Sequence, residues 1–121
     1  MLEGRRPTIN GDGDISRDFT YVDNVITANL LAAASPDASG KTMNVACGER
    51  TSLLELLAAI CAAAGSTVDP VFGPPRVGDI QHSLADISRA RSTIGYGVEV
   101  PFGEGIARTL AWYRAKMGGE A

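Results

Sequence analysis

Basic charge, histidine, cysteine and long apolar runs are all scarce in this sequence, and each shortage excludes a class of protein. Eleven basic residues stand against fourteen acidic ones, for a net charge of -3, and no lysine- and arginine-rich cluster marks a nucleic-acid surface. No stretch approaches the ~20 apolar residues of a membrane-spanning helix, and residues 1–10 lack the apolar segment of a signal peptide. We therefore expect a soluble, cytoplasmic protein that binds neither nucleic acid nor a membrane.

The cysteines, the histidine and the acidic turn do not form a metal-binding pattern. Neither Cys47 nor Cys61 belongs to a C-x-x-C pair, and His82 is the single histidine that could complete a zinc site. Both cysteines lie in apolar surroundings, which is typical of core thiols. Asp12 and Asp14 flank a glycine, but no calcium-loop spacing follows them. We predict no metal site.

The chain's apolar residues recur at helical spacing in four segments. With 121 residues, 45% of them hydrophobic, there is material for one modest domain spanning residues 1–121. The clearest predicted helix, 53–64, begins with a capping box formed by Ser52 and Glu55 and ends at Gly65. The other predicted helices cover about 23–34, about 86–94 and a C-terminal segment from about residue 102.

Each of the two longer flanking helices carries an apolar stripe, which we expect to pack against a sheet. The first stripe comprises Val22, Val25, Ile26, Leu30 and Ala33. The second comprises Ile106, Leu110, Tyr113 and Met117. Segments 17–22, 42–46 and 69–72 have strand-type sequence, and short strands alternating with helices indicate the α/β class.

Two segments of the sequence partly match the motifs of phosphate-binding loops. Residues 40–42 match the end of a Walker A loop, but Ser35 stands where its first glycine is required. Residues 11–13 could begin a dinucleotide fingerprint, but Ser16 occupies the third glycine position and a strand is predicted where a helix should start. We read both as turns and predict no Rossmann dinucleotide loop and no cofactor-binding residue in this chain.

The Tyr-x-x-x-Lys pair of short-chain dehydrogenases is also missing. In that pair the lysine lowers the pKa of the tyrosine so that its phenolate can take a proton from the substrate. The only lysines are Lys41 and Lys116, and the residues four positions before them are Asp37 and Trp112. The chain therefore has no catalytic residues for redox chemistry on its own.

A hydrolase site at His82 is equally disfavoured. Ser83 is its neighbour in the sequence, and adjacent side chains of an extended segment point to opposite faces. His82 is therefore badly placed to act as a general base for Ser83.

Three segments of the chain resemble a known family in their order and spacing. They are PTINGDGDISRDFTYVDNV (residues 7–25), MNVACGERTSLLELL (residues 43–57) and GPPRVGDIQHSLADISRAR (residues 73–91). Together they are similar to the C-terminal, substrate-binding region of NDP-sugar epimerases of the extended short-chain dehydrogenase family, most like UDP-glucose or UDP-N-acetylglucosamine 4-epimerases. The resemblance implies a small mixed α/β domain of about four helices and short strands, and NAD as cofactor of the complete enzyme.

The resemblance also implies roles for particular residues. Arg17 and Arg76 would contact the diphosphate of a UDP-sugar, and Asp79 would accept a hydrogen bond from a ribose hydroxyl. The residues expected to line the base are Pro7, Thr8 and Ile9. Without the resemblance, Arg17 could be half of a surface ion pair with the following aspartate, and Arg76 could simply stiffen its loop.

Three further charged residues have expected roles that do not involve the ligand. Asp23 is placed to cap the helix that follows it, and Asp18 is expected to order the turn before that helix. Arg50 stays open between loop packing and solvent.

Several functions remain compatible with these features. The family's redox residues lie upstream of the matched region, and Met1 falls where such an enzyme would be mid-chain, so we expect a truncated piece that binds a UDP-sugar and needs a Rossmann half as partner. A 4,6-dehydratase or decarboxylase fragment is the alternative chemistry. A non-catalytic assembly protein, which would form a homo-oligomer through an uncovered apolar face, is the alternative outside enzymology.

Overall fold

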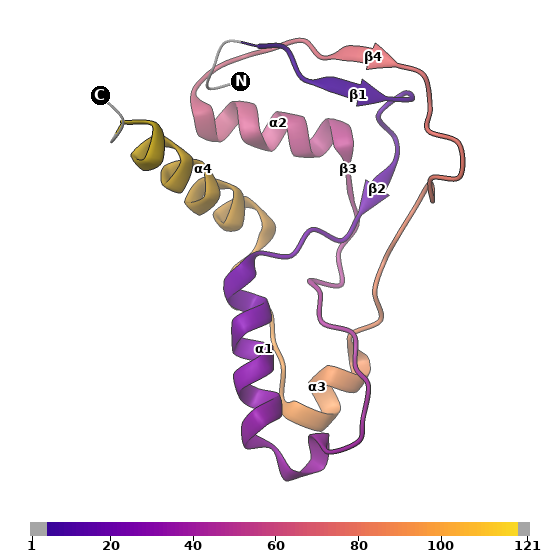
Figure 1. The fold of residues 1–121 in the computed structure, drawn as a ribbon, viewed down its shortest axis with the longest axis vertical. Helices are drawn as coiled ribbons and strands as arrows, with labels where there is room; N and C mark the ends of the chain where they lie inside the picture. Colours follow the sequence, from indigo (N-terminus) through magenta and orange to yellow (C-terminus); the bar gives the residue numbers. More distant parts are fainter. Residues whose placement is uncertain (1–4, 119–121) are drawn as a thin grey trace.

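The computed structural model describes residues 5–118, which form two lobes joined by a narrow junction (Figure 1). The upper lobe in Figure 1 contains the strands and two helices, and the lower lobe contains the other helices. The elements, in chain order, are β1 (Thr8–Asn10), β2 (Ser16–Arg17), α1 (Val22–Ala34), the 3-10 turn η1 (Pro36–Ala38), β3 (Thr51–Ser52), α2 (Leu53–Ala64), β4 (Val71–Gly73), α3 (Ser88–Ile94) and α4 (Phe102–Gly118). The small mixed α/β fold expected from the sequence is confirmed.

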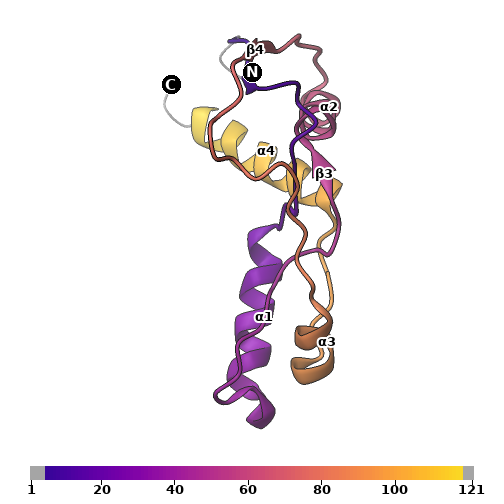
Figure 2. The ribbon, with the colours of Figure 1, turned by 90° about the vertical axis from the view of Figure 1, so that its right-hand side faces the viewer.

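Two short strand pairs organise the upper lobe. Strand β1 pairs in parallel with β4, so that Ile9 lies opposite Phe72. Strand β2 pairs antiparallel with β3, with Arg17 opposite Thr51. Helices α2 and α4 contact each other beside these strands, as the two views in Figures 1 and 2 show. The predicted strand 69–72 is present as β4, whereas the predicted strand 17–22 was wrong beyond Arg17, because β2 ends there and α1 begins at Val22.

Helix α2 begins and ends where local sequence signals predict. The Glu55 amide donates to Ser52 Oγ over 3.2 Å, and the Ser52 amide donates to Glu55 Oε2 over 2.7 Å. These bonds form the capping box, and donation by the Ser52 amide and hydroxyl to the Glu55 carboxylate holds its pKa below the usual value. At the other end Gly65 adopts the left-handed conformation with φ 67°. Leu56 and Ile60 lie half-buried on the predicted apolar face.

The prediction for the apolar stripe of α1 was wrong about which face is covered. Asn24 and Ala28 are buried, while Leu30 is 67% exposed and Ile26 is 51% exposed. The helix contacts α3 and η1, not a sheet, and it does so through the face that carries its small residues. The predicted apolar stripe of α1 is therefore exposed to solvent along the lower lobe.

The predicted apolar stripe of helix α4 is covered only in the N-terminal half of the helix. Leu110 is buried and Ile106 is half-buried, but Tyr113 and Met117 are 50% and 45% exposed. The helix packs against α2, not against a sheet as predicted, because the strand pairs are too short to cover it.

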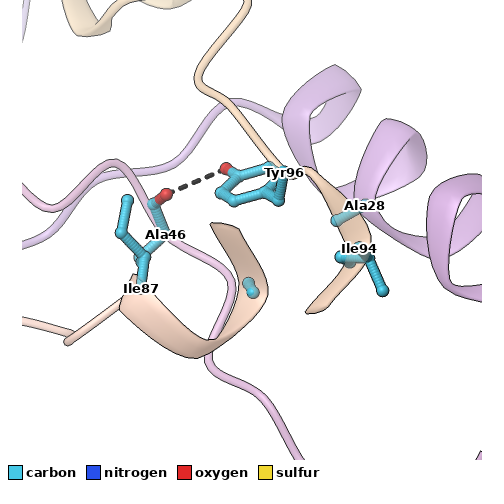
Figure 3. Close-up of a cluster of buried hydrophobic side chains, with 6 residues drawn as sticks. Ala28, Ala46, Ile87, Ile94 and Tyr96 are labelled. Atoms are coloured by element: carbon cyan, nitrogen blue, oxygen red, sulfur yellow. Dashed lines mark hydrogen bonds between the residues drawn. The ribbon is translucent and has the colours of Figure 1, made fainter. Parts of the chain in front are cut away.

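The lower lobe has a core of small and β-branched side chains around one buried tyrosine (Figure 3). Its buried members are Ala28, Ala46, Ile87, Ala90, Ile94 and Tyr96. The Tyr96 hydroxyl donates to the Ala46 carbonyl over 2.8 Å, and burial raises the pKa of this hydroxyl. The phenol therefore stays neutral and keeps donating within an otherwise apolar cluster.

The segment 42–46, predicted as a strand, forms none in the described part of the chain. Side chains satisfy part of its backbone instead. Arg89 donates to the Thr42 carbonyl over 3.1 Å, and the Tyr96 hydroxyl donates to the Ala46 carbonyl over 2.8 Å. A strand-type sequence therefore lies without a strand partner between residues 5 and 118.

Two side chains tie together the segments that cross the junction. Asp18 accepts from the backbone amides of Cys47 and Gly48, each over 2.9 Å. Asn24 accepts from the Val100 amide over 2.9 Å and donates to the Val100 carbonyl over 2.8 Å. The expectation that Asp18 orders the turn before α1 was therefore wrong, because its carboxylate orders a turn far along the chain.

Asp23 does not cap α1, contrary to expectation. The N-cap position is Tyr21, which makes no side-chain capping bond. Asp23 lies within the first turn, where its carboxylate accepts from Arg108 of α4 over 2.9 Å. The two helices are thus joined at the surface by an exposed ion pair.

Candidate functional site

A cavity of about 760 Å³ opens beside the β1–β4 pair. It is lined by Gly11, Asp12, Ile15, Phe72, Gly73, Pro75, Arg76, Asp79 and Gln81. These residues come from the turn after β1, from β4 and from the loop that follows β4. The volume is in the range of small-molecule sites, roughly 300–1,000 Å³.

The turn after β1 requires glycine at two positions. Gly11 has φ 80° and Gly13 has φ 87°, which a residue with a Cβ rarely adopts. A Cβ on Gly13 would lie 2.7 Å from Leu54 Cγ. The Gly11 amide donates to the Gly73 carbonyl over 3.0 Å, so the turn is tied directly to the end of β4. The predicted turn is confirmed, and it forms one wall of the cavity.

Arg17 does not line this cavity, but it is held against Asp79, which does. One guanidinium nitrogen of Arg17 lies 2.6 Å from Asp79 Oδ1, and the other donates to the Ser16 carbonyl over 2.8 Å. The two side chains are 30% and 34% exposed. The structure thus brings together two of the residues expected to bind the ligand, although they are 62 positions apart.

Arg76 lines the cavity without a partner in residues 5–118. Its carbonyl accepts from the Asp79 amide over 3.3 Å across a tight turn in which Gly78 has φ 82°. Its guanidinium makes no hydrogen bond or ion pair in the described structure, and the residue is exposed. The Arg76 guanidinium is therefore available to bind an anionic ligand.

The charges in and beside the cavity balance. Arg17 and Arg76 bring two positive charges, and Asp12 and Asp79 bring two negative ones. Asp12 also accepts from the Asp14 amide over 3.0 Å, which keeps its carboxylate in the turn. An anionic ligand would therefore be selected by where the guanidinium groups point, not by a net positive field.

The three residues expected to line the base lie on the approach to the cavity. Thr8 and Ile9 belong to β1, where Ile9 is buried and Thr8 is exposed. The Pro7 carbonyl accepts from the Val71 amide over 2.8 Å. None of the three is among the residues that line the cavity, so their contact with a base stays a prediction.

Phe72 and Gln81 were not anticipated as site residues. Phe72 is 54% exposed and offers an aromatic face in the cavity. The alternation of the strand-type segment 69–72 could have drawn attention to it, because an exposed phenylalanine on a two-strand ribbon needs an explanation. Gln81 shows no comparable signal in the sequence.

His82 contacts a serine, but not the one beside it in the sequence. Its Nδ1 lies 2.9 Å from Ser16 Oγ, in a hydrogen bond that spans 66 positions. Both residues line a second, smaller cavity of about 310 Å³ together with Arg50 and Glu55. Arg50, whose role was left open, is exposed there.

No three His, Cys, Asp or Glu side chains from 5 to 118 come close enough to hold a metal ion. Over the same range, no helix has the length and apolarity needed to cross a bilayer. Cys47 is buried, and burial raises the pKa of its thiol, while Cys61 is half-buried.

Comparison with known proteins identifies relatives that match nearly the whole chain. The model of the NAD dependent epimerase/dehydratase family matches residues 1–46. UDP-glucose 4-epimerase of Mycolicibacterium smegmatis is 41% identical over 96% of this chain and 37% of its own length. A dTDP-glucose 4,6-dehydratase of Actinoplanes is 31% identical over 95% of this chain and 36% of its own length.

Solved structures show the same similarity in three dimensions. UDP-glucose 4-epimerase of Thermotoga maritima, crystallised with UDP-glucose, superimposes with a TM-score of 0.91 at 34% identity, covering 97% of this chain and 37% of that one. UDP-N-acetylglucosamine 4-epimerase of Methanobrevibacter ruminantium, in complex with UDP-N-acetylmuramic acid, gives 0.87 at 37% identity, covering 95% of this chain and 36% of that one. The chain thus spans little more than a third of the length of these relatives.

Proposed function

The chain corresponds to the C-terminal part of an enzyme of the NAD-dependent epimerase/dehydratase family, and on that premise we propose that it binds the nucleotide-sugar substrate of a UDP-sugar 4-epimerase. The observation that supports this most directly is the position of Arg76 and the Arg17–Asp79 pair at one cavity of about 760 Å³. A diphosphate is well bound by guanidinium groups, and a ribose hydroxyl by a carboxylate acceptor. Both kinds of group lie at this cavity.

The diphosphate, the ribose and the base of a UDP-sugar each have a counterpart among these residues. Arg76, which has no partner within 5–118, would follow the diphosphate, while Arg17 is already oriented by its bond to Asp79. Asp79 Oδ1 faces Arg17, which leaves its second oxygen for a ribose hydroxyl. The exposed ring of Phe72 offers a flat apolar surface to a base.

The residues of this chain do not fit NAD, which the family uses as its cofactor. The turn at Gly11 and Gly13 leads into strand β2, whereas a dinucleotide loop leads into a helix whose N-terminus faces the pyrophosphate. Gly103 and Gly105 form another G-x-G pair in the sequence, but they lie inside helix α4 and not in a loop. The chain would therefore bind and orient the sugar nucleotide, and hydride chemistry would belong to the remainder of the enzyme.

Calorimetric titration of the chain with nucleotides tests this function. We expect saturable binding of UDP and UDP-glucose, binding of UMP at least about tenfold weaker because one phosphate contact is lost, and no binding of free glucose. Equal affinity for UMP and UDP, or no heat with UDP at low salt, would contradict the proposal. Tighter binding of dTDP than of UDP would favour the dehydratase alternative that the relatives also include.

The open stripe of α1 supports a second part of the proposal, a docking surface for the rest of the enzyme. Val22, Ile26 and Leu30 are each more than half exposed along one face of the helix. The strand-type segment 42–46 also lacks a strand partner in the described residues. An uncovered apolar helix beside an unpaired strand-type segment suits packing against another α/β layer.

We expect the chain alone to self-associate through this stripe as its concentration rises. Ile26→Glu should shift sedimentation-velocity profiles towards the monomer, whereas Ala62→Glu, at an exposed position of α2, should leave them unchanged. A monomer at high concentration for the unaltered chain would count against an apolar docking surface. Strong association without any UDP binding would instead favour the non-catalytic assembly protein.

A further inference from the structure

Apart from the Arg17–Asp79 ion pair, the loop that carries Arg76 and Asp79 has few contacts between its two ends. Every residue from 74 to 84 is exposed. The backbone bond within the loop runs from the Asp79 amide to the Arg76 carbonyl over 3.3 Å. The position of its side chains over the cavity therefore depends on that ion pair and on how the two ends of the loop are anchored.

At its first end the loop leaves β4, whose pairing with β1 fixes Gly73. At its second end the anchor is Ser16, a residue only 4% exposed at the start of β2. The Ser16 amide donates to the Gln81 carbonyl over 3.0 Å, and the Ser16 carbonyl accepts from the Ser83 amide over 3.1 Å. Between these two backbone bonds lies the 2.9 Å contact from Ser16 Oγ to His82 Nδ1.

We propose that His82 is a positioning residue, whose side-chain bond to Ser16 holds the Arg76–Asp79 loop over the nucleotide cavity. The inference rests on the proposed nucleotide binding. Ser16 precedes Arg17 directly, so the same short strand sets the positions of Arg17 and of the loop end. Together with the two backbone bonds, the Ser16–His82 bond thereby helps to set the position of the loop, and of Arg76 within it, relative to Arg17.

The geometry does not suit a nucleophile and its base. Ser16 is 4% exposed, and its amide and carbonyl are both engaged with the loop. The pair faces the smaller cavity, with Asp14, Arg50 and Glu55 around it, and neither residue lines the cavity that contains Arg76. The serine oxygen is therefore directed away from where a substrate would lie.

Two substitutions of His82 separate its hydrogen bond from the rest of the side chain. Asparagine places an amide atom near the position of Nδ1, whereas glutamine places its amide near Nε2, beyond reach of Ser16 Oγ. In UDP titrations we expect His82→Gln to weaken binding roughly three- to tenfold and His82→Asn to stay within about twofold of the unaltered chain. Ser16→Ala should match His82→Gln.

Amide hydrogen exchange of residues 76–81 gives an independent readout. Exchange there should be faster in His82→Gln and normal in His82→Asn, while the melting temperature of both stays unchanged because the side chain is exposed. Unaltered affinity and exchange in His82→Gln would overturn the proposal, as would equal losses in both variants. If the unaltered chain does not bind UDP, the proposed function fails, and exchange still decides whether His82 holds the loop.

Discussion

Replacing Arg76 by alanine is expected to weaken UDP binding by about tenfold to a hundredfold. A charge-assisted hydrogen bond to a phosphate contributes roughly 1.5–3 kcal/mol, and Arg76 is the cavity arginine that no partner in residues 5–118 restrains. The loss should shrink as ionic strength rises, because the contact is exposed and screened. Isothermal calorimetry at two salt concentrations measures both effects.

Two controls make this result specific to the cavity. Arg91→Ala removes the same charge from an exposed position of α3, outside the cavity, and should leave UDP affinity within about twofold. Arg76→Lys should recover only part of the affinity, since an ammonium lacks the planar fork. Because Arg76 makes no contact that the fold uses, Arg76→Ala should unfold at the same urea concentration as the unaltered chain. Equal losses in Arg76→Ala and Arg91→Ala would mean that general charge, not this site, attracts the nucleotide.

Local signals explain what the sequence predicted correctly about the fold. The limits of α2 follow from Ser52 and Glu55 at one end and Gly65 at the other, and all three act within one helical turn. The turn after β1 likewise needs only its two glycines. Such features require no knowledge of what lies across the molecule, so their positions could be read before any partner was known.

The predictions that failed depend on distant residues. Periodicity identified a stripe on α1 but could not say which face α3 would cover, and small residues such as Ala28 and Ala32 allow the closer approach. Asp18 was expected to act locally, yet its partners Cys47 and Ala85 lie 29 and 67 positions away. A carboxylate acceptor gives no indication in the sequence of which amides will reach it.

In the candidate site, too, some residues could be predicted from the sequence, whereas their contacts depend on distant parts of the chain. Arg17, Arg76 and Asp79 came from resemblance to a family, since an arginine followed by an aspartate has no specific chemistry by itself. The placement of Arg76 and Asp79 at one cavity, with Arg17 paired to Asp79, depends on the β1–β4 pairing, which joins residues 63 positions apart, such as Ile9 and Phe72. The Ser16–His82 contact was missed because His82 was weighed only against its neighbour in the sequence.

Asn24→Ala is expected to cost about 3–5 kcal/mol of the free energy of unfolding, a large part of what a chain of this size has. Asn24 is fully buried at the junction between the lobes. Its Oδ1 accepts from the amides of Glu99 and Val100 over 3.1 and 2.9 Å, and its Nδ2 donates to the Val100 carbonyl over 2.8 Å. Alanine would leave three backbone groups without partners beside a new cavity.

Asn29→Ala is the matched control, because Asn29 lies on the same helix but is exposed and donates only to the Val25 carbonyl over 2.8 Å. Urea denaturation followed by circular dichroism should place it within about 0.5 kcal/mol of the unaltered chain. The cavity with Arg76 lies in the other lobe, so the folded fraction of Asn24→Ala should still bind UDP with unchanged affinity. A cost below about 1 kcal/mol for Asn24→Ala would show that water or local movement satisfies the Val100 backbone. Asn24 would then not be what joins α1 to the segment before α4.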